Sequence, residues 1–480
     1  MHRKDFFTRV AATALLAAKI KGGEAFAAPP ADSRGVAGPE GPAADRRILL
    51  DRMGVAAGVD RLCTRQLQQA VDLCHRRGGG TVVIPGGVFT TGSIRLRSSV
   101  CLELEAGAVL LGSSDPADYP AQPTPAYRSL KDASAFRALL YAEGEENISV
   151  VGRGTIDGQG AKFAWGRSDM DGRPRLIQFV SCRDVRVEGL RLRNSGLWMQ
   201  HYLNCDRVQL RGLNVWNHSN HNNDMMDIDG CRQVTVSDCI GDTDDDGITL
   251  KSTGPAPCEH VVISNCILSS RCNAIKCGTE STGGFRNIAI SNCVIRPSEA
   301  TEGISGNREG ISGISLEEVD GGVLDGVVIS NISIEGTLVP VFVRLGNRAR
   351  KHRAEAAKPP VGVLRNVRIE NVQVRGAGDI GSSITGLPGH RVENVTLRGV
   401  HVELAAAGKA ADAGRSVPER EDSYPEGKMW GRLPAYGFFV RHASGVRFVD
   451  VTVKPADGEP RPWVVTDDVV NCSGLETPAL

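Results

Sequence analysis

The sequence has no excess of charge of either sign, few aromatic residues and only one long apolar stretch. Basic and acidic residues balance at a net charge of zero, so the composition gives no reason to expect a nucleic acid or an anionic membrane as a partner. Aromatic residues make up only 5% of the chain, whereas there are 56 glycines, and this balance favours a turn-rich β protein. Beyond the N-terminal region no apolar run approaches the length of a membrane span, so the mature protein is expected to be soluble.

The one apolar stretch lies near the N-terminus and has the features of an export signal. Arg3 and Lys4 precede an apolar run at residues 10–18, and the small residues of "AFA" follow at 25–27. A charged start, a short apolar core and a small-x-small cleavage site are typical of a secretory signal peptide, here residues 1–27. The opening "RKDFF" resembles a twin-arginine signal with lysine in place of the second arginine. We expect export to the periplasm or the exterior of a bacterial cell; a disordered or weakly helical tail is the alternative.

Most of the remaining chain repeats a short unit of alternating apolar and polar residues. Each copy reads as two short strands separated at a glycine or an Asn-Cys step, and the regular copies recur about every 23 to 27 residues. Period-two strands in a repeat of this length predict an all-β fold, a right-handed parallel β-helix of about ten rungs. Equivalent residues of adjacent rungs should then lie about 4.8 Å apart. The aligned core residues of five successive copies are Val185, Val208, Val234, Val261 and Ile288.

The cysteines follow the repeat more closely than they follow a disulfide pattern. An exported chain with 13 cysteines would normally use them in disulfides, and a disulfide framework is the alternative here. Stacking of the rungs instead predicts ladders of buried thiols that serve as small apolar side chains. The ladders are Cys182, Cys205, Cys231 and Cys258, and then Cys239, Cys266 and Cys293. A parallel asparagine ladder is predicted at the turns, formed by Asn265, Asn292, Asn331 and Asn371.

The segment "CTRQLQQAVDLCHRRGGG" predicts a short amphipathic helix ahead of the rungs, ended by glycines. Such a helix would cap the open end of the solenoid, where strand edges are otherwise unpaired. With this N-terminal cap, we expect residues 58–480 to form a single parallel β-helix catalytic domain and residues 28–57 to form a linker. The apolar residues at helical spacing are Leu67, Ala70, Val71 and Cys74.

The aspartate cluster in "DTDDDGITLKS" (242–252) can be aligned with three neighbouring rungs. Its apolar positions keep the phase of those rungs, which argues against a floppy acidic loop and places Asp224, Asp245 and Asp246 on one shallow groove. Carboxylates this close cannot all ionise freely, so at least one should hold a proton, as glycosidic cleavage requires. A polar turn ladder is the alternative. The aligned outward columns are Asp224, Asp246, Asn273, Ser312; then Asp227, Thr249, Lys276, Ser315; then Asp229, Lys251, Gly278, Glu317.

At these residues the chain resembles glycoside hydrolase family 28, the polygalacturonase family. The family's NTDG-D motif is matched by "NNDMMD" (222–227), and its DDC-A-K motif by "DDGITLKS" (245–252). The resemblance implies that Asp245 is the general acid, that Asp224 and Asp246 hold the attacking water, and that the reaction inverts the anomeric carbon without a metal or cofactor. It also implies a polysaccharide or oligosaccharide as substrate. No nucleic-acid or membrane partner is expected, and we expect a monomer.

Two departures from the family pattern bear on the substrate. "CNA" (272–274) stands where the family has GHG, so Asn273 replaces its histidine. "SLE" (315–317) stands where polygalacturonases have RIK, so Ser315 and Glu317 replace the arginine and lysine that grip a galacturonate carboxylate. A hydroxyl and an acid at that place should repel a uronate. Plain polygalacturonase activity is therefore not expected.

Other polar residues are candidates for substrate contacts. Lys276, together with Glu280, could bind a differently placed acid or a neutral sugar; alternatively, Lys276 pairs with Glu317 or an aspartate as a salt bridge. Lys251 follows the family pattern and is expected to support the acid pair, while His221 is either a substrate contact or a surface residue. The candidate substrate-binding set is Asn273, Lys276, Glu280, Glu317, Lys251 and His221.

Three function classes remain open on the sequence. The first is a secreted inverting hydrolase of a pectic or related plant cell-wall polysaccharide, with rhamnogalacturonan as one type of substrate. The second is a β-helix polysaccharide lyase that uses a base such as Lys276, and the retained Asp245–Asp246 pair argues against it. The third is a carbohydrate-binding β-helix that has lost catalysis. An Asp245→Asn substitution separates the third class from the first, because it should abolish turnover in a hydrolase and leave a binding protein unchanged.

Overall fold

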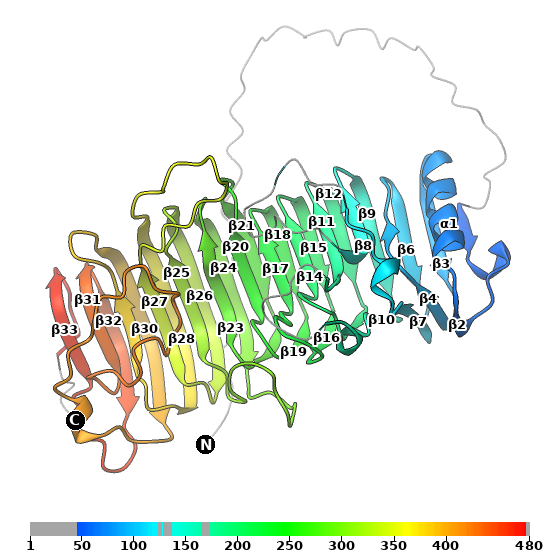
Figure 1. Ribbon diagram of the computed structural model, residues 1–480. Helices are drawn as coiled ribbons and strands as arrows, with labels where there is room; N and C mark the ends of the chain where they lie inside the picture. Colours follow the sequence, from blue (N-terminus) through cyan, green and yellow to red (C-terminus); the bar gives the residue numbers. More distant parts are fainter. Residues whose placement is uncertain (1–45, 123–126, 128–136, 165–171, 477–480) are drawn as a thin grey trace, which may run out of the picture. The chain divides into compact units, whose positions relative to one another are not determined.

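The computed structural model describes residues 46–122, 127, 137–164 and 172–476, so the expected signal peptide lies outside the described residues. The chain winds into a coil of parallel strands that form one 33-stranded sheet (Figure 1). Each strand pairs with the equivalent strands of the rungs before and after it. The architecture is the parallel β-helix that the repeats predict, and the strands stack in three columns along its length.

Column 1 runs the whole length of the coil and is the column of the aligned core valines. Their predicted register is confirmed, since Val185 pairs with Val208, Val208 with Val234, and Val234 with Val261. The strands of column 1 are β1 (Arg47–Leu49), β3 (Gly80–Ile84), β6 (Val100–Leu104), β9 (Glu146–Gly152), β12 (Arg183–Glu188), β15 (Asp206–Arg211), β18 (Arg232–Ser237), β21 (Cys258–Ser264), β24 (Phe285–Ile295), β26 (Val323–Glu335), β28 (Val363–Ala377), β30 (Val392–Leu404) and β32 (Arg447–Lys454).

Column 2 pairs separately in the first rungs and continues into the second halves of the long strands from β24 onward. Column 3 forms the remaining side, and its outward face carries the residues discussed below. The strands of column 2 are β2 (Gly58–Leu62), β4 (Gly87–Thr91), β7 (Ala108–Gly112), β10 (Thr155–Asp157), β13 (Arg191–Arg193), β16 (Asn214–Asn217), β19 (Ile240–Thr243) and β22 (Ile267–Ser270). Those of column 3 are β5 (Ile94–Arg95), β8 (Ala138–Glu143), β11 (Arg175–Val180), β14 (Gln200–Leu203), β17 (Met226–Asp229), β20 (Ile248–Ser252), β23 (Asn273–Ser281), β25 (Ser312–Glu318), β27 (Val339–Leu345), β29 (Ser382–Thr385), β31 (Phe438–Ser444) and β33 (Val464–Val470).

The bend between columns 1 and 2 is made by the asparagine ladder. Asn265, Asn292, Asn331 and Asn371 all have φ between 53° and 57°, a left-handed conformation that asparagine tolerates better than most residues. Each side-chain amide donates to the oxygen of the preceding rung, over 3.4, 3.1 and 2.7 Å along the series. The predicted ladder is therefore confirmed, and it explains why the long strands turn at the same place in each rung.

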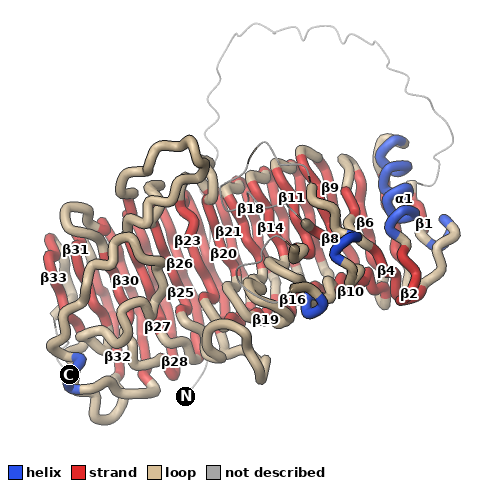
Figure 2. Tube along the Cα trace, viewed as in Figure 1, coloured by secondary structure: helices blue, strands red, loops and turns tan. Residues whose placement is uncertain are grey.

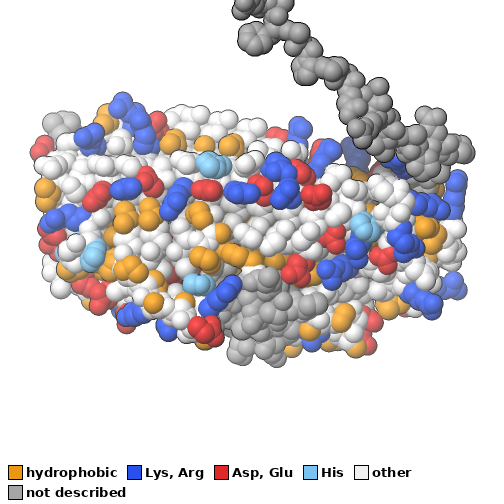
Figure 3. Space-filling model, turned by 90° about the horizontal axis from the view of Figure 1, so that it is seen from above, with side chains coloured by type: hydrophobic (Ala, Val, Ile, Leu, Met, Phe, Trp, Pro, Cys, Tyr) orange, Lys and Arg blue, Asp and Glu red, His pale blue; other side chains and the backbone are white. Residues whose placement is uncertain are grey.

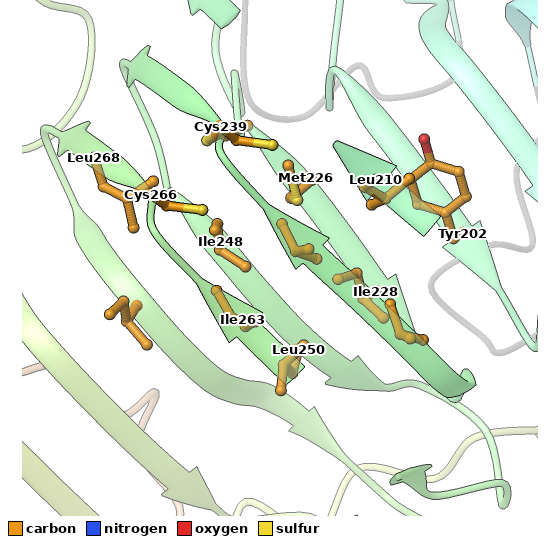
Figure 4. Close-up of a cluster of buried hydrophobic side chains, with 14 of the residues drawn as sticks. Tyr202, Leu210, Met226, Ile228, Cys239, Ile248, Leu250, Ile263, Cys266 and Leu268 are labelled. Carbon is orange, nitrogen blue, oxygen red and sulfur yellow. The ribbon is translucent and has the colours of Figure 1, made fainter. Parts of the chain in front are cut away.

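The core fills the inside of the coil with apolar side chains from all three columns (Figure 4). Met226 stacks on Ile248 and Ile228 on Leu250, as the rung alignment predicts. Cys239 and Cys266 lie among these side chains, and every cysteine of the chain is free. The thiols thus serve as small apolar groups, as expected. Truncating one of the larger core side chains, such as Ile228 or Leu250, to alanine should cost roughly 2–5 kcal/mol of stability.

The N-terminal end of the coil is covered by the expected helix, α1 (Thr64–Arg76), shown in Figure 2. Its buried residues are the four predicted ones, and it packs against β3, β5 and β6. The coil also starts earlier than expected, because β1 lies within the range assigned to a linker and pairs with β3. Residues from 47 onward therefore belong to the β-helix. The sequence does not reveal β1, because this strand has only three residues and carries no copy of the repeat motif. Over the described residues, no helix has both the length and the apolar character needed to cross a bilayer.

Two long connections run outside the coil near the middle and C-terminal rungs. The first, residues 346–362, joins β27 to β28 and is rich in basic residues, among them Arg348, Arg350 and Lys351; we refer to it as the basic connection. The second, residues 405–437, joins β30 to β31 and lies across the outward face of column 3 (Figure 2); we refer to it as the strap. Its own small apolar cluster fixes it there, with Trp430 and Leu433 packed against Val339 and Phe342. Acidic and basic side chains are interspersed over the face shown in Figure 3, in keeping with the neutral net charge.

Short 3-10 turns complete the described structure. None of them contributes to the site discussed below. They are η1 (Asp51–Met53), η2 (Pro116–Asp118), η4 (Gly160–Lys162) and η5 (Ala410–Asp412).

Candidate active site

The outward face of column 3 brings the predicted polar residues together. Asp227 lies opposite Thr249, Thr249 opposite Lys276, and Lys276 opposite Ser315, in the adjacent strands β17, β20, β23 and β25. This is the register expected from the rung alignment. Asp224 and Asp246 lie just before β17 and β20, so the carboxylates gather at one edge of the column.

A cavity of about 190 Å³ opens at this edge. It contains all three predicted catalytic aspartates and three of the predicted substrate-binding residues. The lining residues are Trp198, Asn222, Asp224, Asp245, Asp246, Lys251, Cys272, Asn273, Glu280, Tyr424 and Glu426.

A larger cavity of about 410 Å³ lies elsewhere, along the turns that precede column 1. Its charged side chains pair across the rungs, as Arg183 does with Glu146 at 3.9 Å and Arg232 with Asp206 at 3.1 Å. These are ion pairs between side chains at the protein surface. The three predicted catalytic aspartates lie in the smaller cavity, which is therefore the candidate active site.

The backbone around Asp245 is held by hydroxyl groups at the ends of two strands of column 2, β19 and β22. Thr243 donates from its hydroxyl to the Asp245 carbonyl oxygen at 3.1 Å, and Ser270 from the next rung donates to the same oxygen at 2.7 Å. The Asp246 amide in turn donates to the Asp245 carboxylate at 3.0 Å. These bonds fix the two carboxyl groups side by side on a rigid element, which is what a catalytic pair needs.

The environment drives the pKa values of Asp245 and Asp246 apart. Burial, and then the neighbouring Asp246 carboxylate, raise the pKa of Asp245 to about 6. Burial alone would also raise the pKa of Asp246, but Lys276, Lys251 and the Asn273 amide together hold it below its ordinary value. Near pH 6, Asp246 is therefore ionised while Asp245 is poised to hold or release a proton. Paired carboxyls with separated pKa values are the arrangement of acid–base catalysis.

Asp224 and Asp227 extend the acidic group into the preceding rung. Burial and the neighbouring carboxylates of Asp227 and Asp245 raise the pKa of Asp224 well above its ordinary value. Burial raises the pKa of Asp227 to about 6, although Lys251 opposes the shift. The site therefore concentrates four carboxyl groups, three of them buried and that of Asp245 half-buried, and protonation of some of them relieves their repulsion.

Lys251 lies where the sequence places it, on the wall of the cavity. Its ammonium is 3.4 Å from both the Asp227 and the Glu280 carboxylates, and it lies 5.0 Å from the centre of the Trp198 ring. Its pKa is raised well above the ordinary value because these carboxylates outweigh the effect of burial. Arg348 and Arg350, from the basic connection, also reach Glu280, at 3.8 and 3.3 Å.

Three of the expected substrate contacts are not on the cavity. Lys276 is 1% exposed and Glu317 is fully buried, because the strap lies over this part of column 3 and its Tyr424 hydroxyl is 3.3 Å from the Lys276 ammonium. The structure shows the salt-bridge alternative for Lys276, whose ammonium lies 2.9 Å from the Asp246 carboxylate. His221 is on the loop before Asp224 but is not among the residues that line the cavity. These three residues therefore lie outside the lining of the cavity, and a role for them as direct sugar contacts stays a prediction.

The cavity also contains residues that sequence reasoning did not place there. Tyr424 and Glu426 come from the strap and reach the site from far along the chain; nothing in their local sequence identifies them. Trp198 lines the cavity and is buried. Tyr436, at the end of the strap, is partly buried and packs against the main core.

The acidic group is a poor match for a metal site. Asp245, Asp246 and the Cys272 thiol have donor atoms within 4.8 Å of one another. However, burial and the nearby carboxylates raise the pKa of the Cys272 thiol well above its ordinary value, so the thiol stays protonated and is a weak ligand. The Lys276 ammonium also neutralises Asp246 directly. Nothing in this donor set calls for a cation.

The chain resembles curated polygalacturonases over part of their length. It is 32% identical over 216 residues to a probable polygalacturonase of Vitis vinifera, covering 42% of this chain and 44% of that protein. It is 35% identical over 150 residues to an exo-poly-alpha-D-galacturonosidase of Dickeya chrysanthemi, covering 29% of this chain and 24% of that protein. The matched segments thus span less than half the length of both relatives.

Solved structures share the fold along most of the chain. An exopolygalacturonase of Thermotoga maritima has a TM-score of 0.66 at 20% identity, covering 85% of this chain and 92% of that one. The polygalacturonase of Erwinia carotovora ssp. carotovora has a TM-score of 0.57 at 18% identity, covering 77% and 96%. These similarities confirm the right-handed parallel β-helix. The family model "Glycosyl hydrolases family 28" matches residues 74–420, most of the chain. The chain belongs to glycosyl hydrolases family 28.

Proposed function

We propose that this protein hydrolyses O-glycosidic bonds of a pectic or related plant cell-wall polysaccharide, with Asp245 as the general acid. One observation carries the proposal: Asp245 and Asp246 lie side by side in one cavity and their pKa values are shifted in opposite directions. A protonated acid next to an ionised carboxylate is what cleavage of a glycosidic bond needs. Membership of family 28 and the resemblance to polygalacturonases support the same reaction.

In the proposed reaction, the Asp245 carboxyl donates its proton to the glycosidic oxygen as the bond to the anomeric carbon breaks. Asp246, with Asp224 beside it, holds a water molecule and accepts its proton as the water oxygen bonds to that carbon. The leaving sugar departs as an alcohol, and the other product carries the new hydroxyl. Asp245 ends ionised and Asp246 protonated, so a proton exchange with solvent restores the starting state.

The inverting course is the part of this mechanism that needs its own measurement. Oxygen atoms of Asp245 and Asp246 lie within 4.8 Å, whereas inverting enzymes typically separate their two carboxyl groups by about 6.5–9.5 Å and retaining ones by about 5–5.5 Å. The family resemblance supports inversion, with Asp224 helping to place the water. Proton NMR of the first product formed should show the anomer opposite to the substrate linkage; the same anomer would contradict this part of the proposal.

We further propose that the subsite next to the scissile bond does not grip a galacturonate carboxylate. Ser315 and Glu317 stand in place of the family's cations, and Glu317 is buried with its oxygen bonded by the Ser315 hydroxyl at 2.7 Å. A neutral sugar, as in rhamnogalacturonan, or an acid placed elsewhere would suit this subsite better. Arg350, 39% exposed and 3.3 Å from Glu280, is a cation close to the cavity edge that could meet such an acid.

The experiment is to incubate the mature protein with a panel of homogalacturonan, rhamnogalacturonan and neutral pectic glycans, and to weigh the products by mass spectrometry. Hydrolysis adds one water per cut bond, and the Asp245→Asn variant should add none. Unsaturated fragments without added water would make the protein a lyase and contradict the role of Asp245. Binding without any cleavage, equal in both forms, would favour a carbohydrate-binding protein.

Export and a monomeric state complete the proposal and are tested separately. The charged start and apolar run of the N-terminus support export. Cell fractionation should find the mature protein outside the cytoplasm, and substituting Arg3 should retain it inside if the twin-arginine route is used. Light scattering of the purified protein should give the mass of one chain.

A further inference from the structure

Lys276 is a buried cation that touches a proposed catalytic carboxylate without lining the cavity. Its ammonium is 2.9 Å from the Asp246 carboxylate, and its side chain is only 1% exposed. On its other side lies the Glu317 carboxylate, 4.0 Å away and fully buried. The Tyr424 hydroxyl at 3.3 Å lies beside the same ammonium. A lysine held by three groups in this way has little freedom to turn toward a sugar.

The two oxygens of Asp246 are held from different sides. The Asn273 side chain donates to Oδ1 at 2.7 Å, and the Asn273 backbone amide donates to the same oxygen at 3.1 Å. Lys276 holds Oδ2. Charge-assisted bonds of this kind fix a carboxylate in direction as well as in charge.

The residues by which this chain departs from the family pattern meet at this one place. Asn273 stands for the family's histidine, and Ser315 and Glu317 stand for its two cations. Lys276 lies opposite Ser315 in the neighbouring strand, and the Ser315 hydroxyl donates to Glu317 at 2.7 Å. The departures thus form a connected chain of contacts, from Ser315 through Glu317 and Lys276 to Asp246.

We propose that Lys276 is a positioning residue that keeps Asp246 ionised and aimed at the attacking water, and that Glu317 and Ser315 hold Lys276 rather than a sugar. The assignment rests on the proposed function, in which Asp246 holds the water. It gives the altered residues a role inside the protein, and it accounts for a buried glutamate that would otherwise be an unpaired charge.

The electrostatic surroundings show why Asp246 needs this cation. Carboxyl groups outnumber cations around it, so without Lys276 the Lys251 ammonium and the Asn273 amide would be left to oppose their combined charge. The pKa of Lys276 is raised well above its ordinary value because Asp246 and Glu317 outweigh burial, so the lysine stays charged. The titratable groups that face Asp246 or line its cavity are Asp224 and Asp227 from the β17 rung, Asp245 and Lys251 from the β20 rung, Cys272, Lys276 and Glu280 from the β23 rung, Glu317 from β25, and Tyr424 and Glu426 from the strap.

The deciding experiment measures the protonation of Asp246 without using activity. The full mature protein is labelled with 13C at the aspartate carboxyls, and the Asp246 signal is assigned by its loss in Asp246→Asn. In Lys276→Met we expect Asp246 to titrate higher by roughly one pH unit or more, because the cation that favours its ionised form is gone. Lys276→Arg should keep the titration low. Tyr424→Phe, which leaves the cation in place, is the matched control and should also keep it low.

Removing Lys276 leaves Glu317 buried without its cation, which can itself destabilise the fold. The double variant Lys276→Met/Glu317→Gln removes both charges and is measured beside the single variant. It should fold with a Tm close to that of the wild type and show the same upward shift of Asp246. An Asp246 titration that is the same in wild type and in both Lys276→Met forms would overturn the proposal.

Kinetics on the glycan that the panel identifies give an independent second readout. In Lys276→Met the acid limb of the pH profile of kcat/KM should move upward with the Asp246 titration, while KM changes less than about twofold. A large rise in KM with an unmoved acid limb would mean that Lys276 contacts the sugar, and would also overturn the proposal. If the wild type cleaves no glycan but the titration still shifts, the proposed function fails, and with it the aiming of Asp246 at a water, while the part of the assignment in which Lys276 keeps Asp246 ionised stands.

Discussion

Asp242 and Asp244 lie within four residues of Asp245 and Asp246, but they face a different part of the molecule. Asp242 accepts hydrogen bonds from the Ser298 hydroxyl and the Glu299 amide, both at 2.7 Å. Asp244 accepts from the Ile304 and Ser305 amides at 2.8 and 2.6 Å. This first pair fixes the connection between β24 and β25, whereas Asp245 and Asp246 face the cavity.

The difference comes from what surrounds each carboxylate. Hydrogen bonds satisfy the first pair, and those from His218, the Ser298 hydroxyl and the Glu299 amide lower the pKa of Asp242 despite burial. Asp245 instead has another carboxylate beside it and fewer donors, so its pKa rises to about 6. A carboxylate that is fully satisfied contributes to stability, while one left poorly satisfied is available for chemistry. Substitutions in the first pair should therefore lower stability, whereas substitutions in the second pair should lower activity.

The largest expected effect is the loss of turnover in Asp245→Asn. An amide cannot donate the proton that the leaving sugar needs, so kcat should fall by about 10²–10⁴-fold on the substrate found by the panel. The Tm at neutral pH should not fall, because the substitution removes a carboxylate whose charged form is destabilised by burial. A variant with near-normal kcat would remove Asp245 from the mechanism.

The pH profile should show the same contrast within the catalytic pair. Asp245 must be protonated, so kcat/KM should fall about tenfold per pH unit above its pKa of about 6. Asp246 must be ionised, and its pKa is lowered. The fall of kcat/KM on the acid side should therefore lie at a pH well below its fall on the alkaline side. The bell-shaped profile should thus lie in the acid range. A rate that keeps rising above neutral pH would contradict this order of protonation.

Asp244→Asn should affect stability instead of chemistry. The neutral amide keeps the size of the carboxylate but weakens its bonds to the Ile304 and Ser305 amides and its attraction for Arg271, 3.6 Å away. We expect a loss of about 1–3 kcal/mol in the free energy of unfolding, measured by urea denaturation. Asp245→Asn is the matched control, because it makes the same chemical change one residue further along the chain. Equal losses in the two variants would remove the distinction between the pairs.

Much of the fold and the centre of the site follow from the rung repeat. Alternation of apolar residues fixes which side chains face out, and the register then places Asp227, Thr249, Lys276 and Ser315 in one line. The asparagine and cysteine ladders follow from the same stacking. Such predictions succeed because neighbouring rungs are close in sequence and are held by regular hydrogen bonds.

The parts that the sequence does not reveal lie outside the coil. Lys276 faces outward in the alignment, but the strap covers it, and the Tyr424 that contacts it lies 148 residues further along the chain. The partners of Asp244 are backbone amides, which every residue but proline has, so no motif can mark them. Rung stacking specifies the coil, while the path of a long connection depends on packing such as that of Trp430 on Phe342.

The smallest expected effect concerns His218, which joins the two stabilising aspartates. Its ring nitrogens lie 3.0 Å from Asp242 and 3.6 Å from Asp244, and the ring packs on Trp216. Burial would lower the pKa of His218, but these two carboxylates raise it. Because the folded pKa is raised, the stabilisation is present below the ordinary histidine value of about 6.5 and is lost as pH rises through the folded pKa.

Amide hydrogen exchange at residues 298–305 should therefore become faster as pH rises through that range, by a few-fold after correction for the intrinsic rate. Mass spectrometry of the peptide measures it directly. In His218→Gln the glutamine can still donate one hydrogen bond but cannot titrate, so the corrected exchange rate should no longer change with pH. Wild-type exchange that is flat over the same range would mean that Asp242 and Asp244 hold the connection through its amides alone, with no contribution from the charge on His218.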